Sequence, residues 1–383
     1  MKLDILMEVY IDIKMNIVEN KEAINDFIDC VIEISDSVNS DNWNGEDVMG
    51  IFFNEFNRYK KKSESGQVFT PDHITSLMYK ILEVNANDKI LDAACGSGAF
   101  LVKSMSNMIK EVGGINTKEA KKIKEHSLFG IEFDREIFAL ACANMMIHKD
   151  GKTNLEQLDS RDKEASEWIK SKGITKVLMN PPFERKYGCK KIVENVLNSV
   201  PSGIKCAFIM PEKKMEKDKM GKLLEKHHLE AIIKLPEKLF DAGVTTSIYV
   251  FETGKKQVGE IYGCYIEDDG LERVKNQGRQ DIKDKWMELE NYWVDSIRKR
   301  NDTKYGTSQW IDPKKFLSYQ KPKAEFVLYE EDFVKTMMNY LMFKNKIDVK
   351  EFSDKLINKT LYNSEILKED NNIVIKIKDA EDE

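Results

Sequence analysis

Short apolar segments alternate with helical segments through the middle of this chain, and this alternation constrains the fold more than any other feature. The segments that read as strands are residues 89–92, 128–132, 176–179, 205–210, 229–235 and 247–251. Helical segments lie between them, such as the one after Glu132 that carries Ile137, Leu140 and Met145. Strands alternating with helices predict an α/β fold, in which a mostly parallel sheet is covered on both faces. Ligands of such sheets bind at the carboxyl ends of the strands, so those ends hold the candidate site.

The two flanks of this central part have a different character. Residues 1–62 place apolar side chains at helical spacing and predict a small N-terminal helical bundle. After residue 257 charged segments alternate with aromatic ones, and one more amphipathic helix is expected around Phe333 and Leu341. We therefore expect an N-terminal helical region 1–62, a core 63–257 and a mixed C-terminal extension 258–383 that contacts a partner or DNA.

Composition excludes several classes of protein and site. No apolar run approaches the roughly 20 residues of a membrane span, and the N-terminus lacks the pattern of a signal peptide. The six cysteines form no CxxC pair and the five histidines show no ligand spacing, so neither a disulfide framework nor a metal site is predicted. His227-His228 is expected at a solvated helix end. A reducing, cytoplasmic location fits this cysteine usage.

The net charge of −6 bears on nucleic-acid binding. A protein that grips DNA alone usually carries a strong basic excess, which this chain lacks. It has only local basic patches, such as residues 118–124 and 213–222. Contact with DNA would then come from a local groove or from a partner subunit.

A glycine-containing loop lies between the first predicted strand and the following helix. It reads Asp-Ala-Ala-Cys-Gly-Ser-Gly-Ala-Phe over residues 92–100. Gly96 and Gly98 allow a sharp turn and a close approach of the backbone to a ligand. The loop is neither a Walker A sequence nor a full GxGxxG. The carboxylate of Asp92 suits an amine, such as that of S-adenosylmethionine, better than a pyrophosphate; taken alone, the loop is explained nearly as well by a structural turn.

Acidic residues follow the next two strands. Glu132 ends its strand, where a carboxylate can accept both hydroxyls of a ribose. Asp134 is a neighbour that can instead cap the following helix. Leu158-Asp159-Ser160 is expected to end the third strand, where Asp159 would accept from the adenine amine of a cofactor or simply serve as a turn residue. The ordered series is a stronger signal than any single member.

Asn180-Pro181-Pro182-Phe183 follows the strand over 176–179 and forms a candidate catalytic loop. The amine of adenine is a poor nucleophile because its lone pair is delocalised into the ring. The amide oxygen of Asn180 and the carbonyl of Pro181 can accept its hydrogens and favour a nucleophilic geometry, while the prolines preorganise the turn. Phe183 can stack on a base that has left the duplex. The alternative is a proline turn with a buried Phe, which the preceding cofactor loop disfavours.

These residues together resemble the modification subunit of type I restriction-modification systems, within the gamma class of N6-adenine DNA methyltransferases. Asn180 to Phe183 is an unaltered match, and Glu132 matches the ribose-binding acid of the family. Residues 92–100 are similar to its cofactor loop, with Ala93 in place of the usual Pro and Ala99 in place of the usual Gly.

Further segments are similar to this family. Phe69-Thr70-Pro71 matches its Phe-Thr-Pro segment, which contacts the cofactor. Asp159-Ser160 resembles the third cofactor segment without the usual preceding Gly, and residues 233–247 resemble a late Leu-Pro…Gly-Val-Thr segment. The resemblance covers residues 63–257 well and the flanks poorly.

The resemblance implies a seven-stranded Rossmann-like methyltransferase sheet, S-adenosylmethionine as cofactor, and methyl transfer to a flipped-out adenine. It implies cofactor contacts from Phe69, Thr70, Pro71, Asp92, Gly96, Ser97, Gly98, Glu132, Asp159 and Asn180, and catalysis by Asn180, Pro181, Pro182 and Phe183. The implied partners are double-stranded DNA, a separate specificity subunit, a second methyltransferase copy and, in some systems, a restriction subunit. No membrane is implied.

Two other readings of the chain stay open at this point. An Asn-Pro-Pro-aromatic loop also serves planar amides, so a protein-glutamine or RNA methyltransferase is an alternative. The altered residues Ala93 and Ala99 leave room for a noncatalytic defence scaffold that keeps the fold. The N-terminal helical region is shorter than in most such subunits. Two segments of the C-terminal extension have no assigned role: Asp268-Asp269-Gly270 and Gly278-Arg279-Gln280-Asp281.

Overall fold

The structure is a computed structural model that divides the chain into two compact units, Met1–Gln320 and Lys321–Glu383. The residues it describes are 21–51, 70–149, 154–183, 188–216, 221–237, 239–240, 244–274, 278–322, 329–362, 364–369 and 372–377. Each unit is treated by itself below.

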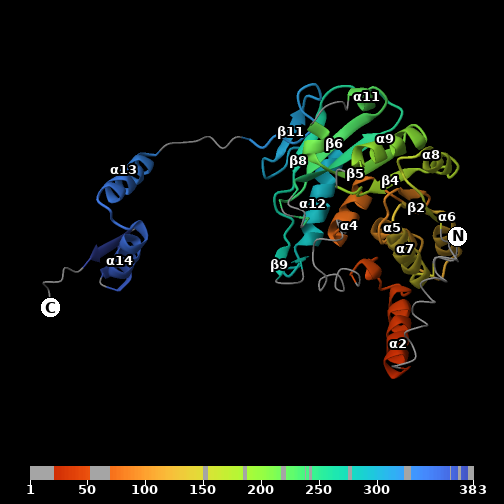
Figure 1. The fold of residues 1–383 in the computed structure, drawn as a ribbon, viewed down its shortest axis with the longest axis horizontal. Coiled ribbons are helices and arrows are strands. Elements are labelled where there is room, and N and C mark those ends of the chain that lie inside the picture. Colours follow the sequence, from red (N-terminus) through yellow and green to blue (C-terminus); the bar gives the residue numbers. More distant parts are fainter. Residues whose placement is uncertain are drawn as a thin grey trace. The chain divides into compact units, whose positions relative to one another are not determined.

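A single large sheet organises the first unit (Figure 1). Its strands are β1 Ile90–Asp92, β2 Leu128–Glu132, β3 Leu155–Gln157, β4 Lys176–Met179, β5 Lys205–Pro211, β6 His228–Lys234, β7 Thr246–Glu252, β8 Ile261–Tyr265 and β11 Ser308–Ile311. Their order across the sheet is β11-β8-β6-β7-β5-β4-β1-β2-β3. The pairs β1–β2, β1–β4, β2–β3 and β4–β5 are parallel, and β7 runs antiparallel between β5 and β6. Because β1 to β4 share one direction, their carboxyl ends lie along one edge of the sheet.

Helices cover both faces of this sheet, as the sequence pattern predicts. One face packs against α4 Asp72–Ile81, α5 Ala99–Glu111, α6 Lys118–His126, α7 Arg135–Ile147 and α12 Trp286–Lys299. The other face packs against α8 Lys163–Lys170, α9 Cys189–Ser199, α10 Glu212–Glu216 and α11 Gly221–Leu224. The strands are buried on both sides, which explains why they read as continuous apolar runs.

The mostly parallel α/β fold is confirmed, but the expected number of seven strands is too low. The described sheet has nine strands, because β8 and β11 extend it beyond residue 257. β8 pairs in parallel with β6, and β11 pairs antiparallel with β8. The run Ile-Tyr-Gly-Cys-Tyr of β8 is fully buried although its surroundings in the sequence are charged, and β11 is an edge strand on which Trp310 is 51% exposed. Neither strand has the alternating pattern by which an isolated strand is recognised.

The described part of the N-terminal region is anchored to this core. It contains α2, Lys21–Val38. The amide Nδ2 of Asn39 donates to the carbonyl of Ile147 at 2.8 Å, and the ring of Trp43 stacks on His148 at 4.3 Å. The helices expected before residue 21 and beyond residue 51 lie outside the described residues, so the N-terminal bundle stays a prediction.

The second unit contains two helices and a hairpin. They are α13 Glu330–Lys344, α14 Val349–Tyr362, β12 Ser364–Glu369 and β13 Asn372–Ile377. Helix α13 confirms the helix expected around Phe333 and Leu341. The boundary placed at residue 257 stays a prediction, since residues 261–311 contribute strands to the main sheet while the second unit begins at Lys321.

The structure also bears on two smaller expectations. Among the residues described, no helix has the length and apolar character needed to cross a membrane. The placement of His227-His228 at a solvated helix end is wrong. His227 is 4% exposed and its Nδ1 accepts from the backbone N–H of Gly254 at 3.3 Å, while His228 begins β6. The neighbouring lysines and glutamates suggested solvent, but the chain turns inward to start a buried strand.

Candidate functional site

The candidate site lies where β1, β2, β3 and β4 end. Asp92 and Glu132 are the last residues of β1 and β2, Asp159 follows β3 by two residues, and Asn180 follows β4 directly. The parallel registers bring these positions, which are far apart in the sequence, to the same edge of the sheet. This placement agrees with the expectation that the sequence motifs stand at strand ends.

The glycine-containing loop turns from β1 into α5 through two left-handed residues. Gly96 has φ of 55° and Gly98 has φ of 97°, and Gly98 is the N-cap of α5. A side chain at either position would impose strain, because L residues rarely adopt positive φ. A Cβ added at Gly96 would meet nothing within 4 Å, so the loop's shape and not crowding calls for glycine there.

Asp92 is a buried carboxyl that pairs with no cationic side chain in the part of the chain that the structure describes. Its side chain is 1% exposed, and Oδ1 accepts from the backbone N–H of Ala94 at 3.1 Å. Burial, helped by the nearby charge of Glu132, raises the pKa of Asp92 to about 8. A ligand that brings a positive charge here would stabilise the ionised carboxylate.

Glu132 ties the ends of two strands together. Its Oε2 accepts from the backbone N–H of Gly96 at 3.0 Å, and its Oε1 accepts from the backbone N–H of Asp134 at 2.9 Å. Burial raises the pKa of Glu132, and these backbone hydrogen bonds partly offset that effect. Asp134 caps α7 by accepting from the N–H groups of Glu136 and Ile137, which is the role the sequence offered as its alternative.

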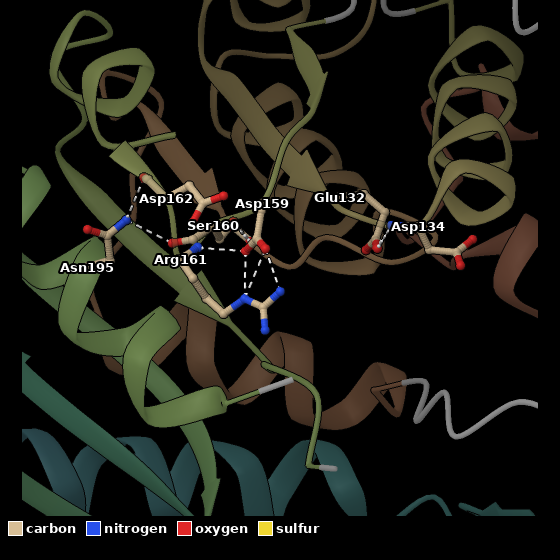
Figure 2. A network of polar contacts seen from close by, with 8 residues as sticks. Glu132, Asp134, Asp159, Ser160, Arg161, Asp162 and Asn195 are labelled. Carbon is tan, nitrogen blue, oxygen red and sulfur yellow. Dashed lines mark hydrogen bonds and ion pairs between the residues drawn. The ribbon is translucent and has the colours of Figure 1, made fainter. Parts of the chain in front are cut away.

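Asp159 faces an arginine two residues away (Figure 2). Its Oδ2 accepts from Nη2 of Arg161 at 2.5 Å and its Oδ1 from Nε at 2.8 Å. These hydrogen bonds lower the pKa of Asp159. Its neighbour Ser160 donates to the carbonyl of Ala93 and is held in turn by Nδ2 of Asn195 at 2.8 Å, which fixes the segment against the cofactor loop. Contact with a cofactor adenine stays a prediction for Asp159, and it would require sharing the carboxylate with Arg161.

The two polar atoms of the Asn180 amide have different surroundings. Its Nδ2 donates to Oγ1 of Thr70 at 2.9 Å, whereas its Oδ1 is buried and has no hydrogen-bond partner among the described residues. Thr70 belongs to the Phe-Thr-Pro segment that leads into α4, with Pro71 as the N-cap residue of that helix. No sequence pattern predicts this contact, which joins residues 110 positions apart. Phe69 lies outside the described residues.

The rest of the catalytic loop is packed against the late segment of the core. Phe183 is 9% exposed, and its ring meets Phe240 edge to face with centroids 5.4 Å apart. Nζ of Lys214 donates to the carbonyl of Phe183. Pro181 is buried and Pro182 partly buried. The lysine and the second aromatic ring were not identified from the sequence, because their contacts join β4 to residues more than 30 positions away.

Asp47 is a further site residue that the sequence did not reveal. Ser97 donates through its hydroxyl to Asp47, and Nδ2 of Asn144 donates to Oδ1 of Asp47 at 2.8 Å and to the carbonyl of Ser97 at 2.8 Å. The backbone N–H of Gly50 also donates to Asp47 at 2.9 Å. From sequence alone an Asp three residues before a Gly reads as a local helix cap. In the structure it also fastens the N-terminal region to the cofactor loop.

The part of the chain that holds the candidate site is similar to known proteins. Residues 44–202 match the family described as N-6 DNA Methylase. The chain is 30% identical over 340 residues to the type II restriction enzyme and methyltransferase RM.BcgI of Heyndrickxia coagulans, covering 82% of this chain and 51% of that protein. It is 22% identical over 215 residues to the type I restriction enzyme EcoEI methylase subunit of Escherichia coli, covering 50% of this chain and 43% of that subunit. The chain thus spans about half the length of these relatives.

A solved structure shares the fold. The modification subunit of a type I restriction enzyme from Vibrio vulnificus YJ016 superposes with a TM-score of 0.56 at 19% identity, over 71% of this chain and 60% of that one. The matched region 44–202 contains every residue proposed for the site, from Phe69 to Phe183. The comparisons therefore confirm the resemblance drawn from the motifs: this chain is similar to the N-6 DNA methylases of restriction-modification systems.

Proposed function

We propose that this chain is an S-adenosylmethionine-dependent DNA methyltransferase that modifies the exocyclic amine of adenine. The observation that carries the proposal is the state of Asn180. Thr70 holds the amide nitrogen, so the amide oxygen stays buried and unpaired at the end of β4. A buried acceptor without a partner is costly in a folded protein. An amine donated by a substrate would remove that cost.

The geometry of the loop explains how the amine would be activated. A hydrogen bond from adenine N6 to Oδ1 of Asn180 favours a lone pair directed out of the ring plane. Preorganisation matters because the acceptor is already aimed before the substrate arrives. Phe183, fixed by Phe240 and by Lys214, offers an aromatic wall to the unstacked base.

The strand ends fit S-adenosylmethionine by their chemistry. Asp92 is a buried carboxyl with a raised pKa, which suits the ammonium of the cofactor's amino-acid part. Glu132 stands at the neighbouring strand end, where ribose hydroxyls are recognised in related α/β folds. When bound, the cofactor supplies a methyl group on a sulfonium, which passes to N6 as the sulfur–carbon bond breaks and N6 gives up one proton to solvent. The chain's own residues, Asn180 and Phe183, would position the amine for this transfer.

Partners complete the proposal. The chain carries a net charge of −6, which argues against strong DNA binding by the chain alone. The relatives named above include a methylase subunit of a type I restriction enzyme. We infer that double-stranded DNA is read by a separate specificity subunit and that a second methyltransferase copy acts beside this one, with a restriction subunit in the complete assembly.

The proposal is tested by supplying the full chain, co-purified with its specificity subunit, with cofactor labelled at the methyl group. Separate pools of DNA, RNA and protein are offered, and we expect label in DNA, at N6 of adenine. Asn180→Ala should lower the transfer rate about 100-fold or more, since a preorganised polar contact to the reacting group is lost. Its affinity for the cofactor, measured by calorimetry, should change little.

A matched control comes from another asparagine of the chain. Asn198 is exposed near the end of α9, where its Nδ2 donates to the carbonyl of Glu194 and its Oδ1 lies 3.4 Å from Nε2 of His227. Neither partner belongs to the candidate site, so Asn198→Ala should keep the wild-type rate. Label in protein or RNA instead of DNA would replace the proposal by the alternative methyltransferase. Absence of cofactor binding by the wild-type chain would favour a noncatalytic scaffold.

A further inference from the structure

The two unassigned segments of the C-terminal extension meet in one structural device. Asp268-Asp269-Gly270 precedes β9, Glu272–Val274, and Gly278-Arg279-Gln280 forms β10, Gly278–Gln280. The two strands pair antiparallel, with Arg273 opposite Arg279. Asp281, which follows β10, accepts from the backbone N–H groups of Lys285 and Trp286 at 2.8 and 2.9 Å and so caps the start of α12. The hairpin therefore leads directly into the helix that packs on α4.

The centre of this device is Asp269, whose side chain is 0% exposed. Nε of Arg279 donates to its Oδ2 at 3.1 Å, and Nη2 of Arg279 donates to its Oδ1, so the guanidinium grips both oxygens. Nη2 also donates to the carbonyl of Leu271 at 3.2 Å. A bidentate arginine–carboxylate pair is directional as well as strong, so it fixes the orientation of the buried carboxylate.

The same carboxylate reaches the first turn of α4. Nε2 of His73 lies 3.3 Å from Oδ2 of Asp269, and the His73 ring packs edge-on against Trp286 with centroids 5.0 Å apart. His73 is 8% exposed and stands three positions after Thr70. Pro71, the N-cap residue of α4, follows Thr70 directly, and its carbonyl accepts from the N–H of Ile74 at 3.0 Å. Thr70 is therefore joined by one peptide bond to the residue that starts the first turn.

The far end of α4 is tied to the same helix by a separate contact. Nζ of Lys80 lies 2.5 Å from Oε2 of Glu290, and Arg298 donates to the carbonyl of Lys80. Glu290 is 4% exposed, so its carboxylate is buried as that of Asp269 is, although its partner Lys80 is more exposed than His73. The two ends of α4 are thus held independently, and only one of them is next to Thr70.

We propose that Asp269, oriented by Arg279, is a positioning residue for Asn180, acting through His73 and Thr70. The inference rests on the proposed function, in which Asn180 accepts the hydrogen of the adenine amine. The route has three steps: the guanidinium aims the carboxylate, the carboxylate and Trp286 set His73, and the first turn of α4 sets the hydroxyl that holds the Asn180 amide. The extension after residue 257 therefore completes the catalytic loop although it touches no reacting atom.

Small errors in this chain of contacts are costly. The direction in which Oδ1 of Asn180 points depends on the single hydrogen bond from Nδ2 to Thr70. A shift of about 1 Å in a group that aligns reactants can cost on the order of 100-fold in rate. Loss of the grip on α4 near Thr70 should therefore lower the rate of transfer, whereas an equal loss near Lys80 should not.

The test compares Asp269→Asn with Glu290→Gln in the full chain co-purified with its specificity subunit. Both substitutions are nearly isosteric, and both weaken a polar contact between a buried carboxylate of the extension and a side chain of α4. Methyl transfer to unmethylated genomic DNA is followed in a single turnover with saturating cofactor. We expect a fall of about tenfold or more for Asp269→Asn and of less than about twofold for Glu290→Gln. Asp269→Glu should recover part of the rate, because it restores the charge for Arg279.

A second measurement does not depend on activity. Amide hydrogen exchange of the peptide that covers residues 70–79, read by mass spectrometry, should quicken in Asp269→Asn and stay near wild type in Glu290→Gln at its first turn. Equal rates and equal exchange in the two variants would overturn the inference. If the wild-type chain leaves DNA unmethylated, the proposed function fails, and the exchange comparison alone then decides whether Asp269 positions Thr70.

Discussion

Two aspartates from opposite ends of the sequence hold the site, and they do so by different chemistry. Asp47, before the core, binds Ser97, Asn144 and the N–H of Gly50, which are all neutral donors. Asp269, in the extension, is gripped by Arg279 and lies against His73. The first supports the cofactor loop, and the second supports the helix that leads from Thr70.

The partners decide how each carboxyl responds to protons. Burial raises the pKa of Asp47, and its neutral hydrogen bonds offset this only in part. Burial would raise the pKa of Asp269 as well, but the nearby ring of His73 and the hydrogen bonds from Arg279 outweigh it and leave the pKa below its usual value. A buried carboxylate without a cation near it remains sensitive to pH, whereas one locked to an arginine behaves as a fixed charge.

The sharpest way to break the comparison is to remove one donor from each aspartate. Arg279→Met leaves a buried, unpaired carboxylate and should lower the free energy of unfolding by about 3–5 kcal/mol. Ser97→Ala removes one neutral hydrogen bond and should cost about 1 kcal/mol. Urea unfolding followed by circular dichroism measures both. Adding Asp269→Asn to Arg279→Met should recover part of the loss, and equal losses in the two single variants would contradict the distinction.

Asp92 is a third buried carboxyl, and the cation proposed to pair with it is the ammonium of the cofactor. Its pKa of about 8 means that it is mostly protonated at neutral pH until a positive ligand arrives. The affinity for the ammonium of S-adenosylmethionine should then rise as pH rises toward 8, by up to about tenfold for each pH unit. Above that pH the gain from ionising Asp92 should level off. Calorimetry over this range checks the slope. Asp92→Asn should bind weakly with no slope, and the capping variant Asp134→Asn should keep it; a flat wild-type profile would remove Asp92 from the cofactor site.

The smallest expected effect concerns how stability changes with pH, since Asp47 and Asp269 should contribute in opposite directions. Because the folded pKa of Asp47 is raised, its contribution to stability is present at low pH and is lost as pH rises above the unfolded value of about 3.9. Because the folded pKa of Asp269 is lowered, its contribution is present above about 3.9 and is lost as pH falls. When the free energy of unfolding is plotted against pH, Asp47→Asn should therefore reduce the slope above about pH 3.9. Asp269→Asn should reduce the slope below that pH. Profiles changed in the same direction would refute the assignment of partners.

Much of the fold follows from local pattern. The strands over 128–132 and 176–179 have the predicted bounds, and the candidate residues stand at parallel strand ends as the alternation requires. Beyond residue 257 the pattern fails, because β8 is a buried strand in a charged neighbourhood and β11 is an edge strand with one face in solvent. Local composition cannot report a pairing partner that lies elsewhere in the chain.

The site shows the same division between local and distant information. Gly96 and Gly98 indicate a turn from sequence alone, because glycine lacks a Cβ and readily adopts positive φ. The contacts of Asp47, Thr70 and Asp269 could not be predicted, because they join residues 50, 110 and 10 positions apart. Thr70 is singled out only by its resemblance to a family segment, which does not indicate its hydrogen bond to Asn180. The hydrogen bonds from Arg161 to Asp159 could not be predicted either, although the two residues are only two positions apart. Sequence spacing does not determine the direction in which a guanidinium points.

The grip of Arg279 on Asp269 has a consequence for the time course of synthesis. Arg279 follows Asn180 by 99 residues, since 279 minus 180 is 99. At the usual pace of translation the ribosome needs roughly 5 to 20 seconds to cover that stretch. During this interval the catalytic loop is already made while the residues that steady α4 are not. If Asp269 positions Asn180 as proposed, a nascent chain would have its Asn180 correctly oriented only after Arg279 has been added, and the proposed methyl transfer would begin only then.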